Sequence, residues 1–302
     1  MKIHIVLLLS CFFLITKVIA QQTPEYTQYM YNMSVVNPAY VGINEGVSLG
    51  FLAKTQWAGV NGAPKSINAF IHSQVGENIG LGLFLIHDKI GPVTETHSYA
   101  DFSVTIKPSK KSKLSFGLKA GATFQQIGLL KLNQTDPNDP KFNQNVNKTY
   151  PNFGIGVLYY LERFYLGLSI PNILESLHFE RSNGIIVRAS QKTNGFLTTG
   201  YVFNLKKYFK LKPSILTRYN NSSPILIDMS LNLLWKNKFE LGVSHRFNNS
   251  WSGVVNLKAT NNLRVGYGYN HVISNFSRFN SGSHEVLLLF NFQENPTLNR
   301  FF

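Results

Sequence analysis

The chain has 302 residues, a formal net charge of +14 and an aromatic content of 13%. Its mean hydropathy is near zero, and after residue 20 no apolar run reaches the length of a membrane helix, which excludes a helical membrane protein. The same composition is compatible with a transmembrane β-barrel, because barrel strands average apolar and polar positions.

Residues 1–20 are typical of a secretory signal peptide. Lys2 gives a basic start, an apolar run extends from Ile5 to Ile15, and Ala20 precedes the predicted cleavage point. Cys11 is the only cysteine and lies inside this leader, so the exported chain is expected to hold no disulfide and no thiolate metal site. A lipoprotein acceptor site at the same cysteine is the alternative, but it would leave apolar residues on the mature protein. Export also excludes nucleic acid as a partner for the positive charge.

From residue 46 onward the sequence alternates between apolar and polar residues, a period of two that predicts β-strands. The longest alternation runs from Lys113 to Gln125. It exceeds the usual length of a strand in a soluble sandwich, which is the alternative fold, and it suffices to cross a membrane. The alternation also predicts that a lysine is costly at Leu118, facing lipid, and mild at Thr123, facing the lumen. About fourteen such segments follow one another. They are 46–57, 66–74, 79–87, 94–106, 113–125, 152–161, 164–170, 194–203, 210–220, 225–235, 239–246, 252–259, 263–270 and 284–292.

The links between these segments predict an orientation in the membrane. Every second link is short, whereas the alternate set includes the long segments 131–151, 171–193 and 271–283. Bacterial outer-membrane barrels have short periplasmic turns and longer outer loops. We therefore predict an all-β fold, a transmembrane antiparallel outer-membrane β-barrel formed by residues 21–302. The segment 21–45 before the first strand is expected to fold into the lumen or on the periplasmic side.

Lysines cluster at three of the predicted periplasmic turns, at residues 107–113, 206–212 and 236–238. One interpretation is that they are solvated and meet the anionic headgroups of outer-membrane lipid. The other is that they form a basic rim that binds an acidic periplasmic partner.

Residue patterns that would support catalysis or metal binding lack their required context. A GxSxG match at residues 46–50 lies within a strand and no helix follows it, so it cannot form a nucleophile elbow. On one strand, His97 and Asp101 share a face while Ser98 points the other way, which prevents a local triad. The histidines lack ligand spacing, and residues 136–140 lack the glycine and distal Glu of a calcium loop. We therefore predict no catalytic, cofactor-binding or metal-binding residues, and no enzyme.

Six short blocks in one order resemble a known family. They are QYMYN (28–32), NPAYVG (37–42), QWAGVNGAPKS (56–66), DKIGP (88–92), SYADFSVTI (98–106) and GSHEVLLLFNF (282–292). Together they resemble the PorP/SprF family of type IX secretion system outer-membrane proteins over essentially the whole mature chain. The resemblance implies a role in secretion or surface attachment of a partner protein, such as an adhesin of gliding motility. It also implies contact with other type IX secretion components on the periplasmic side.

Two functions are therefore expected for this barrel. The first is a non-catalytic component of the secretion system, with a secreted cell-surface protein as partner. The second is a passive porin, because a lumen lined by Gly, Ser, Lys and Arg suits small anionic solutes.

Aromatic and turn residues around the first strand are the candidate partner-binding site. Trp57 is predicted to fold over the outer mouth, in a turn that contains Asn61 and ends at Lys65. Tyr26, Tyr29 and Tyr31 (with Met30 between them) are predicted to lie in the lower, periplasmic half of the lumen.

Overall fold

The computed structural model describes residues 26–44, 46–131, 144–174, 176–182, 185–191, 193–220, 223–273, 277 and 280–292. Most of these residues form strands, and the helical elements among them are 3-10 turns of three residues each. The strands are β1 (Val47–Thr55), β2 (Lys65–Val75), β3 (Ile79–Ile90), β4 (Val93–Ile106), β5 (Lys113–Ile127), β6 (Val146–Tyr160), β7 (Phe164–Ile170), β8 (Ser176–Ser182), β9 (Ile185–Gln191), β10 (Gly195–Tyr201), β11 (Phe203–Lys206), β12 (Phe209–Asn220), β13 (Ser223–Trp235), β14 (Phe239–Arg246), β15 (Ser250–Lys258), β16 (Leu263–Val272) and β17 (Ser283–Phe292). No helix in this part of the chain is long and apolar enough to cross a membrane.

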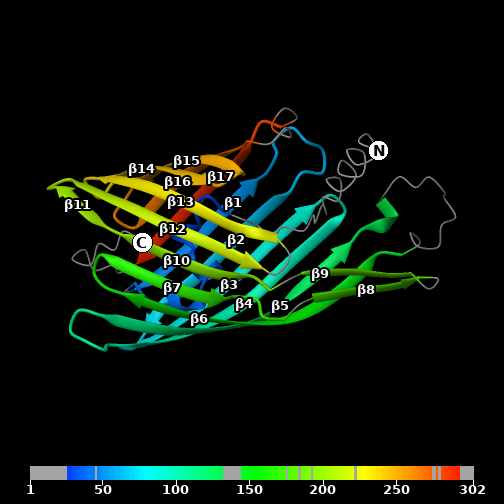
Figure 1. Ribbon diagram of the computed structural model, residues 1–302, viewed down its shortest axis with the longest axis horizontal. Helices are drawn as coiled ribbons and strands as arrows, with labels where there is room; N and C mark the ends of the chain where they lie inside the picture. Colours follow the sequence, from blue (N-terminus) through cyan, green and yellow to red (C-terminus); the bar gives the residue numbers. More distant parts are fainter. Residues whose placement is uncertain are drawn as a thin grey trace, which may run out of the picture.

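The strands close into an antiparallel barrel (Figure 1). The first and last strands pair along their whole length, from Val47 opposite Phe292 to Thr55 opposite His284. On the opposite side of the barrel, β10 and β11 are one wall strand interrupted at Val202, since both pair with β12. The barrel therefore has fourteen strands, which confirms the predicted fold class and strand count.

The predicted alternation places apolar side chains outside and polar or small ones inside. On β5, Leu118 and Phe124 are 58% and 51% exposed, whereas Ser115, Lys119 and Thr123 are buried on the inward side. The exposed apolar residues recur on all sides of the barrel, which is the surface that a hydrocarbon environment requires. Closure pairs the backbone polar groups of neighbouring strands with one another, as strands in lipid require.

Strand ends and connections divide the barrel into two ends. The short turns after β2, β4, β6, β11, β13 and β15 lie at one end, together with the start of β1 and the end of β17. We call this the periplasmic end, on the rule of short periplasmic turns. The connections of the outer end are mixed rather than uniformly long, because β3–β4 and β14–β15 are joined by tight turns.

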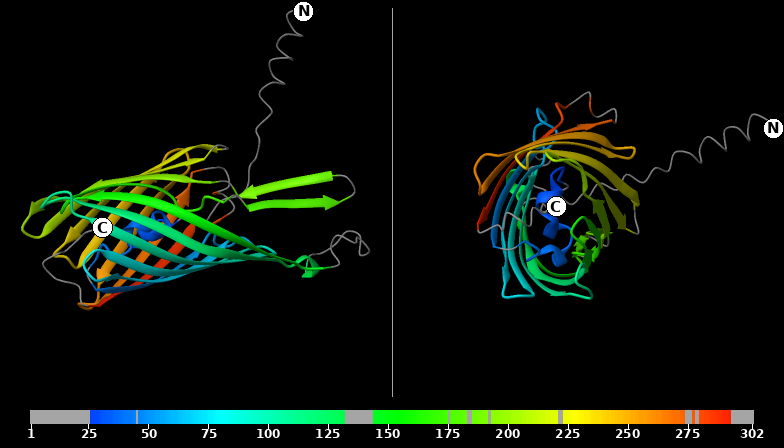
Figure 2. Two further views of the ribbon diagram at one scale, coloured as in Figure 1. Left: turned by 90° about the horizontal axis from the view of Figure 1, so that it is seen from below. Right: turned by 90° about the vertical axis from the view of Figure 1, so that its left-hand side faces the viewer.

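Two of the predicted long outer loops contain strand. Inside the loop predicted at 171–193, β8 and β9 pair as a separate two-stranded sheet that extends beyond the outer end (Figure 2). Inside the loop predicted at 131–151, β6 begins at Val146, opposite Ile127 of β5, while residues 132–143 lie outside the described residues. The predicted loop ended at Pro151, which the structure places in β6. Since β7 pairs only with residues 155–160, this proline lies where β6 has a strand neighbour on one side.

Candidate functional site

The lumen contains the segment between residues 26 and 44, which we call the plug. Figure 2 shows it in dark blue inside the ring of strands. It folds as three consecutive 3-10 turns, η1 (Tyr29–Tyr31), η2 (Met33–Val35) and η3 (Pro38–Tyr40). The Asn-Pro pair starts the last turn, because the Asn37 side chain accepts a hydrogen bond from Ala39 N–H at 2.9 Å and Pro38 fixes the first position. Most plug side chains are buried among apolar residues of the barrel interior.

The beginning of the plug is bound to the last strand. The carboxylate of Glu285 accepts the backbone N–H groups of Thr27 at 2.7 Å and Gln28 at 3.0 Å. The same carboxylate pairs with Lys54 of β1 at 3.1 Å, and both side chains are almost fully buried. The ion pair therefore links the closing strands to the plug at the point where the barrel closes.

A second contact joins η1 to the wall formed by β13–β16. The Tyr31 hydroxyl donates to Glu240 and accepts from the Asn256 side chain at 3.2 Å. Glu240 also pairs with Arg264 at 3.4 Å, and the Arg264 guanidinium lies 5.4 Å from the centre of the Tyr31 ring. A buried carboxylate is costly unless it is paired and hydrogen-bonded, so this tyrosine contributes to the stability of the wall itself.

The opposite wall, β3–β7, binds the end of the plug through side chains that reach its backbone. Ser169 donates to Val36 O at 2.8 Å, and Ser103 donates to Val41 O at 2.6 Å. Lys119 donates to Ser34 O at 3.0 Å while it pairs with Asp101 at 3.3 Å. The buried carbonyl groups of the irregular plug are satisfied in this way.

Two glycines on this wall make room for η3. A Cβ added to Gly117 would lie 2.2 Å from Ala39 N, and one added to Gly156 would lie 2.0 Å from the Asn37 side-chain oxygen. The Asn37 amide in turn donates to Val157 O at 3.1 Å. Close approach of the plug backbone thus requires the absence of side chains on β5 and β6.

The plug separates cavities at the two ends of the lumen. The outer vestibule consists of two adjoining cavities that share Tyr26, Tyr29, Asp228 and Arg246 in their linings. The periplasmic vestibule is lined by Met30, Tyr31, Met33, Ser34, Tyr40, Ile43 and Asn44 of the plug together with residues from β2, β12, β13, β15–β17 and their turns. None of its lining residues lines the outer vestibule.

The predicted partner-binding residues are divided between the outer and the periplasmic ends of the lumen. Trp57 lines the outer vestibule, and Asn61 and Lys65 are exposed at the same end. Tyr31 lies at the periplasmic vestibule, as the sequence predicted. The prediction was wrong for Tyr26 and Tyr29, which line the outer vestibule. The reason is that the chain descends through the lumen from Tyr26 before it turns back into β1.

The turn that carries Trp57 is held by backbone hydrogen bonds to neighbouring outer connections. Ala58 N–H donates to Gly282 O at 2.8 Å, and Ser281 N–H donates to Ala58 O at 2.9 Å. Gly91 N–H donates to Gly62 O at 3.0 Å. Trp57 itself has a positive φ of 48°, an uncommon conformation for a large residue. Trp57 therefore lies at the outer mouth on a turn that is hydrogen-bonded to two neighbouring outer connections.

Sequence reasoning missed the acidic residues that bind the plug. Glu285 and Glu240 occupy inward positions of apolar strands, so a charged residue inside an alternating strand was the available signal. Ser98 points outward while His97 and Asp101 are buried inside, and His97 contacts Thr123 at 2.7 Å. Within the described ranges no three His, Cys, Asp or Glu residues form a metal-binding group.

Comparison with known proteins gives one family and one fold. The profile of the family described as "Type IX secretion system membrane protein PorP/SprF" matches residues 18–290. No curated protein matches the chain. Among solved structures, the outer membrane protein Omp33 of Acinetobacter baumannii is similar with a TM-score of 0.50 and 10% identity, over 83% of this chain and 100% of that one.

The CymD monoaromatic hydrocarbon channel is similar with a TM-score of 0.53 and 12% identity, over 87% of this chain and 93% of that one. At such identities the similarity shows the fold alone, an outer-membrane β-barrel. Fold and family profile together establish the location of the protein in the outer membrane. The chain belongs to the PorP/SprF family of type IX secretion system membrane proteins.

Proposed function

We propose that this protein is a plugged, non-catalytic barrel that supports the secretion or surface attachment of a partner protein by the type IX secretion system. The plug carries this proposal. It is bonded to both walls of the lumen, through Glu285 and Glu240 on one side and through Lys119, Ser103 and Ser169 on the other. A barrel filled in this way offers surfaces at its two ends rather than a path between them.

The outer end supports the binding of a secreted cell-surface protein, such as an adhesin of gliding motility. Trp57, Tyr26 and Tyr29 line a recess there, and the exposed residues Asn61 and Lys65 lie on the adjacent rim. Aromatic side chains in a recess with polar surroundings commonly provide most of the binding energy of a protein interface. The family profile supports the secretion system as the setting.

A passive porin is the second candidate, and one observation favours it. The barrel has a cavity at each end, and a similar fold serves as a hydrocarbon channel in CymD. Passage of a solute would require displacement of the plug, which is held by buried hydrogen bonds and ion pairs. We therefore expect the purified protein to show no steady conductance in planar bilayers. Steady wild-type conductance would support the porin.

Substitutions at the outer mouth test the attachment function. Trp57→Ala combined with Lys65→Ala is expected to lower the surface display of the partner, while the amount of barrel in the outer membrane stays normal. The matched control is Lys110→Ala, an exposed position at the periplasmic end. Normal display from a normally abundant double variant would contradict the proposed site, and loss of the barrel itself would make this loop structural.

A further inference from the structure

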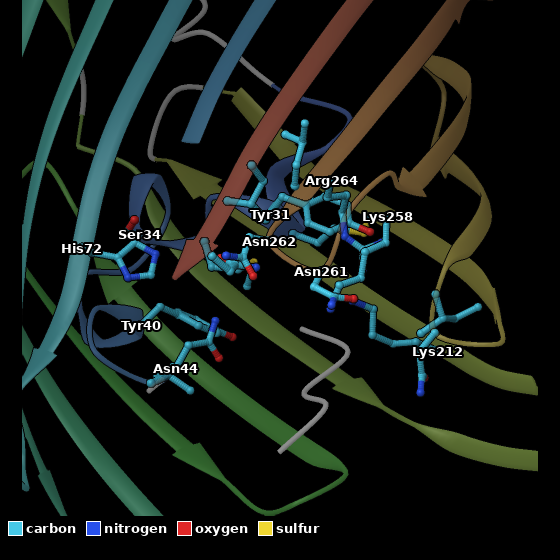
Figure 3. Close-up of a pocket in the computed structure, with 18 residues that line it drawn as sticks. Tyr31, Ser34, Tyr40, Asn44, His72, Lys212, Lys258, Asn261, Asn262 and Arg264 are labelled. Carbon is cyan, nitrogen blue, oxygen red and sulfur yellow. The ribbon is translucent and has the colours of Figure 1, made fainter. Parts of the chain in front are cut away.

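Three cations gather in the periplasmic vestibule. Lys212 of β12, Lys258 of β15 and Arg264 of β16 line it, and no Asp or Glu is among its lining residues. Figure 3 shows these cations on one side of the space and His72, Tyr40 and Asn44 across from them. Five asparagines also line the vestibule and supply amide donors and acceptors. They are Asn44, Asn261, Asn262, Asn291 and, at the rim, Asn237.

A second basic cavity adjoins this vestibule at the rim of the barrel. It lies between the β11–β12 hairpin, which contributes Lys207 and Lys210, and the β13–β14 turn, which contributes Lys236 and Lys238. Asn237 lines both cavities. The cations of the lumen and those of the rim therefore follow one another along a continuous surface, which we call the basic track.

Two carboxylates of the described residues lie near the basic track. Glu240 pairs with Arg264 at 3.4 Å from the plug side, and Glu162 lies within interaction range of Lys210. Four lysines and no Asp or Glu of the described residues line the rim cavity, so that partly enclosed space carries one sign of charge. Such an arrangement focuses the field and attracts negatively charged ligands.

We propose that the basic track binds an extended acidic segment of a periplasmic polypeptide. The track extends from Lys258 and Arg264 in the vestibule to lysines on the turns of the rim, which suits a chain rather than a single small anion. Met33 and Leu289 add apolar surface beside the cations, which an inorganic anion would not use. Lipid headgroups can reach the rim, but the vestibule lies between the plug and the inner face of the barrel wall, away from the membrane.

This inference rests on the proposed secretion function only for the identity of the partner, and it concerns the end of the barrel opposite Trp57. If the wild-type protein bound no peptide while surface display depended on Trp57 and Lys65 as expected, the basic track alone would be refuted. If the Trp57 and Lys65 variant lost surface display but bound the peptide normally, the result would support the outer site and would leave the basic track unaffected.

The test measures binding of a fluorescent oligoglutamate peptide to the purified full-length barrel in nanodiscs of zwitterionic lipid. The variant Lys236→Gln with Lys238→Gln is expected to weaken binding about fivefold, and the addition of Lys258→Gln to weaken it further. The control Lys110→Gln with Lys111→Gln removes the same charge from another exposed turn of the same end and is expected to change binding less than twofold. Binding should fall as ionic strength rises.

A second measurement locates the bound peptide. An environment-sensitive dye attached at Asn261→Cys is expected to respond to the peptide, whereas the same dye at Ser109→Cys on the β4–β5 turn should not. A response at neither position would overturn entry into the vestibule. Equal weakening by the control pair would mean general charge attraction.

Three further outcomes would also overturn the proposal. Displacement of the peptide by millimolar inorganic phosphate would indicate a small-anion site. Loss of binding in nanodiscs that contain anionic lipid would indicate a lipid site. Binding only to a chain shortened to residue 292 would identify residues 293–302 of the protein itself as the occupant.

Discussion

Glu285 and Gln28, which are 257 residues apart in the sequence, are joined by a buried hydrogen bond of 3.0 Å. The donor belongs to the plug and the acceptor to the strand that closes the barrel. Because Glu285 also pairs with Lys54 on the first strand, one carboxylate connects plug, first strand and last strand. The seam of the barrel and the filling of its lumen are therefore stabilised by the same side chain.

The variant Glu285→Gln tests this connection. We expect it to lower the free energy of unfolding by about 3 kcal/mol, because it removes the charged partner of Lys54 from a buried ion pair. Urea unfolding in lipid vesicles measures this change. Glu77→Gln, which removes an exposed carboxylate at a periplasmic turn, is the control and should have almost no effect. Equal stability of Glu285→Gln and wild type would show that the pair contributes nothing net.

Gly117→Ala tests whether the wall must lack a side chain where η3 approaches. The added Cβ would lie 2.2 Å from Ala39 N, so plug or strand must shift, and we expect a destabilisation of about 1–3 kcal/mol. Displacement of the plug should also produce intermittent conductance in planar bilayers. The control is Gly253→Ala on β15, where an added Cβ meets no atom within 4 Å. A Gly117→Ala protein that is as stable as wild type and shows no conductance would contradict tight packing of the plug.

A lysine on the lipid-facing surface should be costly in a depth-dependent way. Leu118→Lys is expected to cost about 2–4 kcal/mol near the middle of the membrane, and Ile106→Lys at the end of β4 about 1 kcal/mol or less. Unfolding titrations in vesicles of one lipid compare the two. Similar costs at both positions would place Leu118 away from the middle.

The packing around Thr123 changes the expectation for a lysine there from the mild effect that alternation alone predicted to a costly one. Thr123 is buried and contacts His97 at 2.7 Å and Tyr99 at 3.2 Å, so Thr123→Lys is expected to disrupt a packed polar cluster. The same unfolding titrations measure this variant. Thr123→Lys as stable as wild type would mean that the lumen has room for a long side chain there.

Single cysteines test which end faces the cell exterior. Ser109→Cys on the β4–β5 turn should react with a membrane-impermeant maleimide only after the outer membrane is permeabilised. Asn61→Cys, exposed at the opposite end, should react in intact cells. Asn183, in the outer loop predicted at 171–193, lies outside the described residues and is not used. Reversed labelling would invert the topology.

The sequence by itself determined the wall of this barrel. A period of two is a local property that each strand carries on its own, so the outward positions of β5 and β16 could be assigned before any pairing was known. Turn residues between alternating segments likewise marked the links, and the six ordered blocks indicated the family that the profile match then confirmed.

Only the tertiary structure decided what fills the lumen inside the wall. The plug has no periodicity that indicates a position, and its path depends on partners from distant strands, such as Glu285 for Gln28 and Ser169 for Val36. The same holds for the vestibules, because the barrel brings Lys212, Lys258 and Asn237 to one space from separate strands and turns. Contacts between residues far apart in the sequence arise from closure of the sheet, and no local pattern specifies them.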